Sequence, residues 1–580
     1  MKKLIALFLC LVMVLGLVAC GAKQEEPKVE EPAPSTTETK EPEAKPEEVA
    51  PAQPEEVAPE LGTLPLVTEE TTITIGLMQN ANTEDYETNE YTKWLEEQTG
   101  LNLDFVYFSN DKTEAVTQLN LMIAGGEKLP DILWYMTGVD TALMYELGED
   151  GYILDLKDYF SEYGYYFWES YNEVPEMDRE KIFQFGTSPA DGALYAFPAY
   201  QQSATDSCNT LTAINTKWLE AVGAEAPTTV DELYEVLKKF ATEDPNGNGV
   251  IDEMPLAGYE TGYRTDIVSF IINAFVYCCD SNFFNATDGQ VWAPYNTDEY
   301  RQALIYLNKL YAEGLLTPLF YTITDKAELT ALQTPTDGVA VAGILGSHPS
   351  LHYETDSPVM YEYTALAPLK GATELGGYAP LRGSSYTYNT FITADCEDPV
   401  LAFKLLDLMS GSESVWRQRY GVYGVDWEYA SEGTFSNLGY PAKVKVLDSS
   451  VYSSQNNKCW HVVNAVLPQA IFAAEWTDDG SWATTRSKIS IANFNNYTYG
   501  AHPDEVVEKL IYTTEEQETV SAVKTQIEDY VAQARAMFVS GVMDPNDDAQ
   551  WNTYLADLET QGLSQYVEVA QTAYTRMTAE

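Results

Sequence analysis

Thr72-Ile73-Thr74-Ile75-Gly76-Leu77 alternates polar with apolar, β-branched residues, and this pattern predicts a strand at the start of the folded region. A helix is predicted around Tyr91–Glu96, and a second strand at Leu101–Val106. A further helix near Ala115–Ala124 leads to a third strand at Leu129–Trp134. Because strands and helices alternate here, the sequence predicts an α/β fold with a parallel sheet and flanking helices.

Two aromatic residues stand at the end of the third predicted strand. Ligands of open α/β sheets lie outside the carboxyl ends of the strands. Trp134 and Tyr135 occupy such an end, so both are candidate ligand contacts. The folded region, about residues 67–580, is long for one domain, which favours two lobes.

The chain begins with a secretory signal. Met1-Lys2-Lys3 is basic, and the apolar run Leu4–Leu17 is too short for a comfortable membrane span. Val18-Ala19-Cys20 resembles a bacterial lipobox, which implies a signal peptide of residues 1–19 and lipid on Cys20. An ordinary signal peptide that contains a cysteine is the alternative. The lipobox interpretation places the protein at the cell membrane, lipid-anchored on its extracellular face.

Residues 20–66 are predicted to form a disordered tether. From Ala22 to Glu60 the chain is rich in Glu and Pro, has no aromatic residue, and repeats Pro46–Pro51 as Pro54–Pro59. This composition cannot bury enough apolar surface to fold, and proline and like charges extend it.

The composition argues against several partners and frameworks. With 33 Lys and Arg against 89 Asp and Glu, the formal net charge is -56, which argues against nucleic acid as a partner. After Cys10 leaves with the signal and Cys20 is lipidated, five cysteines remain without regular spacing: Cys208, Cys278, Cys279, Cys396 and Cys459. This set does not indicate a disulfide framework.

Catalytic motifs are weak. His348 and His352 are four residues apart, but Pro349 between them disfavours a helical zinc pair, and no H-E-x-x-H occurs. G-x-S-x-G, a P-loop and a strand-to-helix G-x-G-x-x-G are also missing from the sequence. A glycosidase needs only two carboxylates, so that class stays open.

The stretch Asp244-Pro245-Asn246-Gly247-Asn248-Gly249-Val250-Ile251-Asp252-Glu253 follows the pattern of an EF-hand loop. Its alternate side chains carry oxygen, and Gly249 stands at the sixth position, where that loop needs glycine. Pro255 occupies the twelfth position, so Glu253 is the substitute acid. The predicted Ca²⁺ ligands are Asp244, Asn246, Asn248, Val250 (through its carbonyl), Asp252 and Glu253. A solvated Asn-Gly turn is the alternative.

A helix is predicted directly before this loop. Thr229 and Glu232 have capping-box spacing. The apolar residues that follow recur at helical spacing: Leu233, Val236, Leu237 and Phe240.

Several stretches, in order, resemble the bacterial extracellular solute-binding proteins of family 1, in the large calcium-containing lipoprotein subgroup. Leu121–Gly126 with Leu129–Ile132 resembles the first-lobe signature, and Asp191–Pro198 resembles the crossing segment. Further matches are Ile214–Leu219, Tyr300–Tyr311, Glu313–Pro318, Ala367–Gly371, Tyr420–Trp427, Met543–Asn546 and Trp551–Leu555. The resemblance covers nearly all of the folded region.

This resemblance implies a two-lobed, periplasmic-binding-protein-like α/β fold. Each lobe would be a mixed sheet flanked by helices, with hinge segments and a helical C-terminal part. We expect lobe 1 at about residues 67–197 and 337–420, and lobe 2 at about 198–336 and 421–580. The calcium would be structural. The resemblance implies a monomer that binds without catalysis, captures a solute by hinge closure and delivers it to the permease subunits of an ABC importer.

An oligosaccharide is the solute we expect. Sugar rings stack on aromatic faces, and the chain has 40 Tyr and 11 Trp. The candidate contacts are Trp134, Tyr135, Tyr200, Gln201, Tyr263, Arg264, Trp292, Arg382, Tyr386 and Trp460. A peptide or other non-sugar solute, a secreted carbohydrate-active enzyme and a surface interaction protein are the alternatives.

Overall fold

The computed structural model describes residues 61–202, 211–261, 265–278, 283–333, 338–354, 357–380, 385–498 and 500–579. The predicted signal peptide, Cys20 and the tether up to residue 60 lie outside these ranges. Pro59–Glu580 forms one compact unit. Within the described ranges, no helix has both the length and the apolar character that crossing a membrane requires.

The first lobe is built on a mixed sheet in the order β12-β3-β1-β2. β1 (Thr71–Met78) pairs in parallel with β2 (Leu101–Phe108) and β3 (Ile132–Trp134), and β12 (Phe391–Ile392) runs antiparallel to β3. The predicted strand and helix series is confirmed. Asp131 ties β3 to β1, because its Oδ2 accepts hydrogen bonds from the backbone N–H (2.8 Å) and the hydroxyl (2.7 Å) of Thr74.

Helices surround this sheet. They are α2 (Glu90–Thr99), α3 (Lys112–Gly125), α4 (Thr141–Glu149), α5 (Lys157–Tyr163), α6 (Tyr166–Asn172), α7 (Glu176–Arg179), α8 (Lys181–Gln184), α14 (Pro399–Ser410) and α15 (Ser412–Tyr420). α2 begins at Asn89, whose side chain accepts from the Tyr91 N–H, and stops at Gly100, which takes a φ of 77°.

The second lobe has its own mixed sheet, in the order β10-β5-β9-β6. β5 (Thr212–Asn215) pairs antiparallel with β9 (Ala342–Gly346) and β10 (Tyr363–Ala365), whereas β6 (Met254–Ala257) is parallel to β9. The other elements of this lobe are α9 (Thr216–Ala221), α10 (Val230–Thr242), α11 (Ile267–Ile272), β7 (Asn285–Thr287), β8 (Gln290–Trp292), α12 (Asp298–Ala312) and α13 (Lys326–Leu332), with short 3₁₀ turns at Pro294–Asn296, Pro349–Leu351 and Pro358–Glu362.

α10 confirms the helix predicted before the calcium loop. The Thr229 hydroxyl accepts from the Glu232 N–H at 3.2 Å, as an N-cap does. The apolar stripe of α10 is buried in the core of the second lobe: Leu233, Val236, Leu237 and Phe240. The Glu232 carboxylate accepts from Thr228 rather than from the N–H of Thr229, so the capping box is displaced by one residue.

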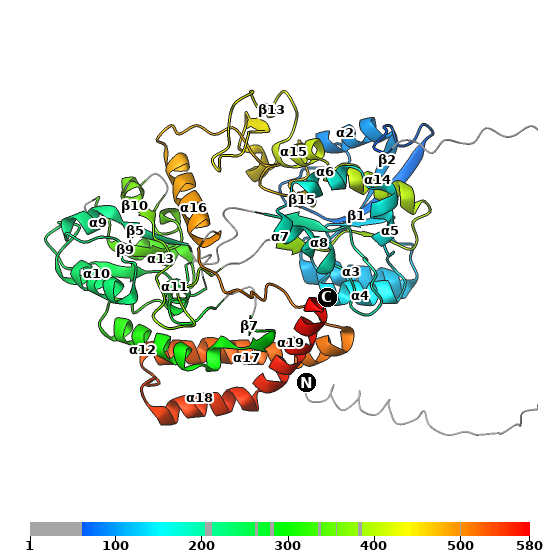
Figure 1. Ribbon diagram of the computed structural model, residues 1–580. Helices are drawn as coiled ribbons and strands as arrows, with labels where there is room; N and C mark the ends of the chain where they lie inside the picture. Colours follow the sequence, from blue (N-terminus) through cyan, green and yellow to red (C-terminus); the bar gives the residue numbers. More distant parts are fainter. Residues whose placement is uncertain are drawn as a thin grey trace, which may run out of the picture. The chain divides into compact units, whose positions relative to one another are not determined.

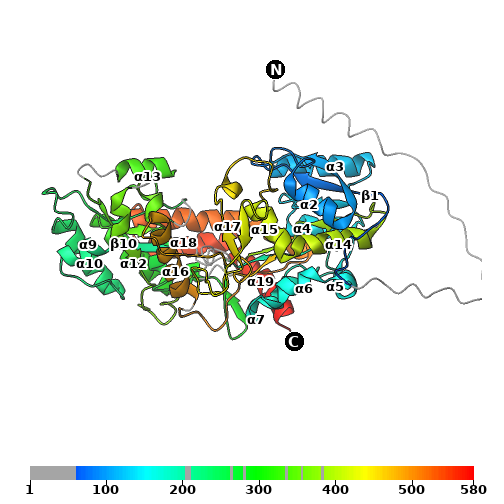
Figure 2. The same cartoon turned by 90° about the horizontal axis from the view of Figure 1, so that it is seen from above.

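The C-terminal part is helical, as predicted. α16 (Trp482–Thr498) packs against β10 (Figure 1 and Figure 2). α17 (Thr514–Ser540) lies along α12 (Figure 1), and its buried residues join the core of the second lobe. α18 (Asp548–Thr560) and α19 (Leu563–Thr578) complete this group.

A third, three-stranded sheet links the lobes. β4 (Ala199–Gln201) lies between β11 (Ser385–Thr387), which is antiparallel to it, and β15 (Val466–Leu467), which is parallel. Each strand stands where the chain passes between lobes: β4 precedes β5, β11 follows β10, and β15 precedes α16. The three passages are therefore hydrogen-bonded to one another, and we call them the linking sheet.

The residue ranges of the two lobes in the structure differ from the predicted ranges at two places. Residues 338–365 contribute β9 and β10 to the second lobe, although we expected them in the first. Residues 421–467 belong with the first lobe, where the hairpin of β13 (Trp427–Tyr429) and β14 (Val444–Val446) follows α15 and Trp460 joins the core. The passages fall in strands of two or three residues, which are too short to show a periodic pattern.

The first residues described belong to the first lobe rather than to the predicted tether. Leu64 and Leu66 pack against its core, and the Tyr166 hydroxyl donates to the Gly62 carbonyl at 3.3 Å. We therefore place the end of the tether before Leu61. Cys278, Cys396 and Cys459 are buried, while Cys208 and Cys279 lie outside the described residues.

Candidate functional site

Two predicted ligand residues face each other in the linking sheet. Tyr200 of β4 and Tyr386 of β11 are register partners, with ring centroids 5.4 Å apart. Tyr200 is fully buried, and its hydroxyl donates to Asp178 Oδ2 at 2.7 Å. Burial, followed by the charges of Asp178 and Glu508, raises the pKa of Tyr386. Both tyrosines therefore stabilise the link between the lobes, and Gln201 beside them is exposed.

Trp134 and Trp460 are core residues. Their exposed fractions are 2% and 0%, and their rings meet at 5.0 Å with an angle of 75°. Trp460 Nε1 donates to the Thr92 hydroxyl at 2.9 Å, so its polar edge is satisfied inside the lobe. The prediction that these two rings contact a ligand is corrected for this structure, because neither presents a face to solvent.

Tyr135 fits the prediction better. It lies at the carboxyl end of β3, where the parallel strands of the first lobe end, and is half-buried. Its φ of 54° is rare for a bulky residue, and such strained backbone is concentrated at ligand sites. Its N–H donates to Thr390 Oγ1 at 3.1 Å, and Asn464 Nδ2 donates to the same oxygen at 2.6 Å.

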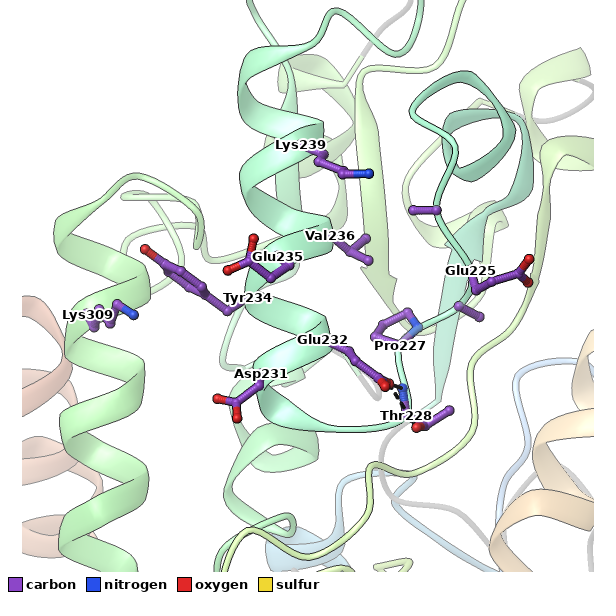
Figure 3. Close-up of a pocket in the computed structure, with 12 residues that line it drawn as sticks. Glu225, Pro227, Thr228, Asp231, Glu232, Tyr234, Glu235, Val236, Lys239 and Lys309 are labelled. Atoms are coloured by element: carbon purple, nitrogen blue, oxygen red, sulfur yellow. Dashed lines mark hydrogen bonds between the residues drawn. The ribbon is translucent and has the colours of Figure 1, made fainter.

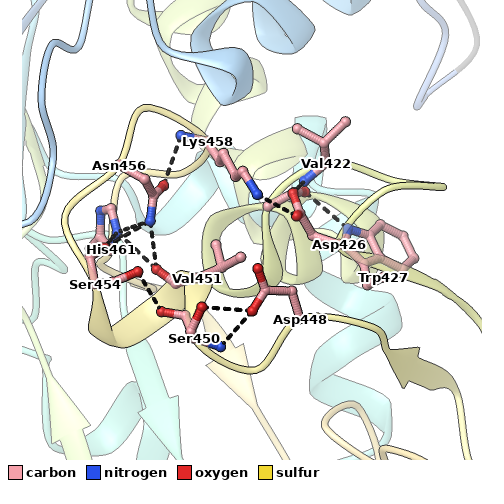
Figure 4. Close-up of polar contacts among 11 residues, drawn as sticks. Val422, Asp426, Trp427, Asp448, Ser450, Val451, Ser454, Asn456, Lys458 and His461 are labelled. Carbon is pink, nitrogen blue, oxygen red and sulfur yellow. Dashed lines mark hydrogen bonds and ion pairs between the residues drawn. The ribbon is translucent and has the colours of Figure 1, made fainter.

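A polar network holds the segment after α15 together (Figure 4). His461, which also has a positive φ of 56°, places Nδ1 3.1 Å from Thr83 Oγ1. Its Nε2 lies 3.1 Å from the carbonyl oxygens of Val451 and Ser454 and 3.1 Å from Asn456 Nδ2. Burial lowers the pKa of His461, which is consistent with a neutral ring.

An ion pair anchors the other end of the same network. Lys458 Nζ lies 2.5 Å from Asp426 Oδ1, and Asp426 Oδ2 accepts from the Val422 N–H at 2.9 Å (Figure 4). Trp427 Nε1 donates to the Gly421 carbonyl at 3.0 Å. These bonds fix the course of the chain from Gly421 to His461 along the first lobe.

The remaining predicted contacts are scattered or not described. Trp292 lies on β8, half-buried against the core of the second lobe, and its Nε1 donates to Thr287 Oγ1 at 3.1 Å. Tyr263, Arg264 and Arg382 lie outside the described residues.

The prediction missed a group of residues near Tyr135. Burial, and after it the Tyr452 phenol, raises the pKa of Tyr135. Tyr452 in turn lies under the Arg419 guanidinium, 4.7 Å from its ring centroid. The run Arg417-Gln418-Arg419-Tyr420 was the available signal, since planar cations beside aromatic rings are typical of ligand sites.

The predicted calcium loop is a series of Asx turns. Asp244 Oδ1 accepts from the Asn248 N–H (3.1 Å) and its Oδ2 from the Gly249 N–H (2.9 Å). Asn246 Oδ1 accepts from the Asn248 N–H (2.9 Å), and Asn248 Oδ1 accepts from the Val250 N–H (2.7 Å). The oxygens at alternate positions therefore turn toward the inside of the loop.

Glu253 closes the loop in an unfavourable electrostatic setting. Its Oε2 accepts from the Asp252 N–H at 3.1 Å, but Oε1 is buried without a hydrogen-bond partner. Burial, with the charges of Asp244 and Asp252, raises the pKa of Glu253. Three carboxylates thus share a loop that supplies no cation of its own. Across the described residues, no group of three or more His, Cys, Asp or Glu side chains is arranged to hold a metal.

A cavity of about 730 Å³ lies elsewhere, around the first turns of α10 (Figure 3). It contains none of the predicted ligand residues. Three of its polar side chains are engaged locally: Glu232 accepts from Thr228, Lys239 Nζ donates to the Val222 carbonyl at 3.0 Å, and Lys309 Nζ lies 3.4 Å from the Tyr234 ring centroid.

Comparison with known proteins places this architecture in a family. The model of the bacterial extracellular solute-binding protein family matches residues 76–416. The fructooligosaccharide ABC transporter substrate-binding protein FusA of Streptococcus pneumoniae is 24% identical over 497 residues, which are 83% of this chain and 85% of FusA.

Two solved structures share the fold over most of the chain. An HMO-binding, ABC-transporter-associated solute-binding protein from Bifidobacterium longum infantis has a TM-score of 0.68 and 21% identity, over 88% of this chain and all of that one. An EF-hand mutant of S. pneumoniae FusA in complex with fructo-nystose has a TM-score of 0.64 and 20% identity, over 88% of this chain and all of that one. Because the family match spans more than half of the sequence, the chain belongs to the bacterial extracellular solute-binding protein family.

Proposed function

We propose that this protein is the solute receptor of an ABC importer, that it is lipid-anchored through Cys20 on the extracellular face of the membrane, and that its solute is an oligosaccharide. Membership of the extracellular solute-binding family carries the proposal. The oligosaccharide is supported by FusA and the HMO-binding protein, whose names state a carbohydrate and an ABC transporter.

The linking sheet supports capture by hinge motion. Its three strands, of two or three residues each, hold three passages between the lobes side by side. A solute that contacts both lobes favours the closed form, because it binds that form more tightly than the open one. Tyr135 and Gln201 remain our proposed contacts among the predicted residues that the structure describes, and Trp292 stands apart from them.

We propose a structural Ca²⁺ in the loop of residues 244–253. The side-chain oxygens of Asp244, Asn246, Asn248, Asp252 and Glu253, with the Val250 carbonyl, make an all-oxygen donor set, which suits calcium. The orphaned Glu253 Oε1 and its raised pKa fit a cation that would satisfy this oxygen. When bound, the ion supplies positive charge to three carboxylates and ties the end of α10 to the start of β6. The EF-hand of FusA supports the same assignment.

The protein acts without catalysis and as a single copy, and its macromolecular partners are the permease subunits. The relatives named above are binding proteins, which supports the non-catalytic role.

Calorimetric titration of the full-length chain with a panel of oligosaccharides and peptides tests the proposal. We expect binding of an oligosaccharide, no turnover of it, and a rise in melting temperature by mass action. A peptide that binds while every oligosaccharide fails would contradict the carbohydrate proposal, and cleavage of the sugar would contradict the non-catalytic one.

A further inference from the structure

Arg419, near the carboxyl end of α15, is a half-buried cation without an acidic partner. Among the described residues its guanidinium makes no ion pair within 4.0 Å, and its polar neighbour is the Tyr420 hydroxyl. Arg417, two positions earlier, is neutralised: its Nη2 lies 2.8 Å from Glu413 Oε1. In a chain with 89 acidic and 33 basic side chains, such an unpaired guanidinium is unexpected.

Aromatic rings hold this guanidinium in place. The Arg419 Cζ lies 4.7 Å from the Tyr452 ring centroid, 5.1 Å from that of Phe472 and 5.8 Å from that of Tyr420. Stacking on aromatic faces orients the planar fork, and the N–H donors that Tyr420 does not occupy are available to another molecule. Tyr452 is itself fixed, because the polar network of Figure 4 includes its neighbour Val451 and the turn at Ser450 and Ser454.

The same rings connect Arg419 to the carboxyl edge of the first lobe's sheet. Tyr452 belongs to the segment that is bonded to the loop after β1, because the Asn456 N–H donates to the Asn82 carbonyl at 2.9 Å and His461 Nδ1 lies 3.1 Å from Thr83 Oγ1. Solutes of open α/β sheets lie at this edge. Arg419 therefore belongs to the same side of the lobe as our proposed contact Tyr135.

The chemistry of a free, stacked guanidinium is specific. Its fork matches a carboxylate with two parallel charge-assisted hydrogen bonds, which are about twice as strong as bonds to neutral hydroxyls. From this we infer that Arg419 binds a carboxylate of the solute, so that the oligosaccharide is an acidic one, built with uronic acid residues. This inference rests on the proposed function, since it concerns the same solute site.

The test compares acidic sugars with their own neutral esters. Trimers of galacturonic, glucuronic and mannuronic acid, and the methyl ester of each, are titrated into the full-length chain by calorimetry. We expect at least one free-acid trimer to bind about tenfold or more tightly than its ester, which corresponds to about 1.4 kcal/mol.

Two matched substitutions decide whether Arg419 is responsible. Arg419→Met keeps a long side chain against Tyr452 and Phe472 but removes the charge, so it should lower the affinity for the free acid to about that for the ester. Arg417→Met removes a guanidinium that Glu413 already occupies, so the preference should stay. If Arg419→Met fails to fold, Arg419→Lys, which keeps the charge but not the fork, should reduce the preference about threefold or more.

The outcomes separate this inference from the proposed function. If neutral oligosaccharides bind and no free acid binds more tightly than its ester, the acidic solute is refuted and the receptor function stands. If the preference exists but survives in Arg419→Met, the assignment to Arg419 is refuted. If no oligosaccharide of either kind binds, the proposed function falls, and this inference falls with it.

Discussion

The indole rings of Trp134 and Trp460 meet edge to face, with 5.0 Å between their centroids, and each is followed by a residue with positive φ. Tyr135 and His461 are these following residues, with φ values of 54° and 56°. The buried tryptophan pair thus joins β3 to a segment more than 300 residues later, and both chains turn sharply where they leave the core. Strain at two adjoining turns fits a surface built for binding.

Replacing Trp460 tests its assignment to the core. Trp460→Ala should lower the free energy of unfolding by about 3–5 kcal/mol, because it opens a cavity beneath Trp134. Trp460→Phe should cost less, since a ring remains and the losses are part of the indole volume and the hydrogen bond to Thr92. Urea unfolding measures both, with the half-buried Trp292→Ala as a milder control. Weakened solute binding at unchanged stability would instead restore Trp460 as a ligand contact.

The sequence predicts those elements of the fold whose apolar residues repeat with a regular spacing along the chain. The alternation in Thr72–Leu77 and the helical spacing of Leu233 to Phe240 are repeated often enough to predict β1 and α10. The linking sheet has no such signal, because β15 spans only Val466–Leu467 and its partner β4 lies far away in the sequence. Pairings of this kind depend on tertiary contacts, which is why the predicted lobe boundaries were misplaced.

The candidate site divides in the same way. Tyr135 could be predicted, because the carboxyl end of a parallel strand is where ligands of such sheets lie. Trp134 and Trp460 could not be separated from surface aromatics, since burial follows from packing between distant segments. Arg419 was missed for a related reason: its lack of an acidic partner is a property of the folded surroundings and not of the residue or its neighbours in sequence.

Calcium removal should separate the predicted loop from an ordinary turn. Excess EDTA should lower the melting temperature of the natural chain, because a ligand bound only to the folded state stabilises it by mass action. Asp244→Ala should start at the lower temperature and show no further loss with EDTA.

Asp288→Ala is the matched control for that experiment. Asp288 has a φ of 50°, close to the 47° of Asp244, but lies in the turn between β7 and β8. Its substitution should leave the EDTA response intact. A natural chain that melts at the same temperature with and without EDTA would contradict the calcium site.

We expect Arg535 to stabilise the packing of the C-terminal helices on the second lobe through two ion pairs. From α17, its Nη2 lies 2.7 Å from Glu260 Oε1 and its Nη1 3.3 Å from Asp266 Oδ2. Arg535→Met would leave two largely buried carboxylates without a counter-charge, so we expect a loss of about 2 kcal/mol or more in unfolding free energy.

The exposed ion pair of Lys128 with Glu397 provides the comparison for Arg535. Lys128→Met should change stability by less than about 0.5 kcal/mol, because solvent screens that pair. Both variants are measured by urea unfolding at pH 7. Equal effects of the two substitutions would show that Arg535 contributes no more than a surface charge.

Because of Lys509, the free energy of unfolding should rise with pH in the alkaline range. Its ammonium lies 5.0 Å from the Tyr388 ring centroid and 6.0 Å from that of Phe185, and burial lowers its pKa from 10.5 to about 8. Between these values the unfolded chain binds more protons than the folded one at this site, so stability rises with pH. At most this amounts to about 1.4 kcal/mol per pH unit.

Two variants separate the contribution of Lys509 from that of the other groups that titrate between about pH 8 and pH 10.5. The unfolding free energy of the natural chain minus that of Lys509→Met should increase by about 1–3 kcal/mol from pH 8 to pH 10.5. Lys509→Arg should give the same increase when it replaces Lys509→Met as the reference, because a guanidinium keeps its proton throughout. A difference that stays constant over this range would mean that the Lys509 ammonium is solvated in the folded protein, and that its position between the two rings costs nothing.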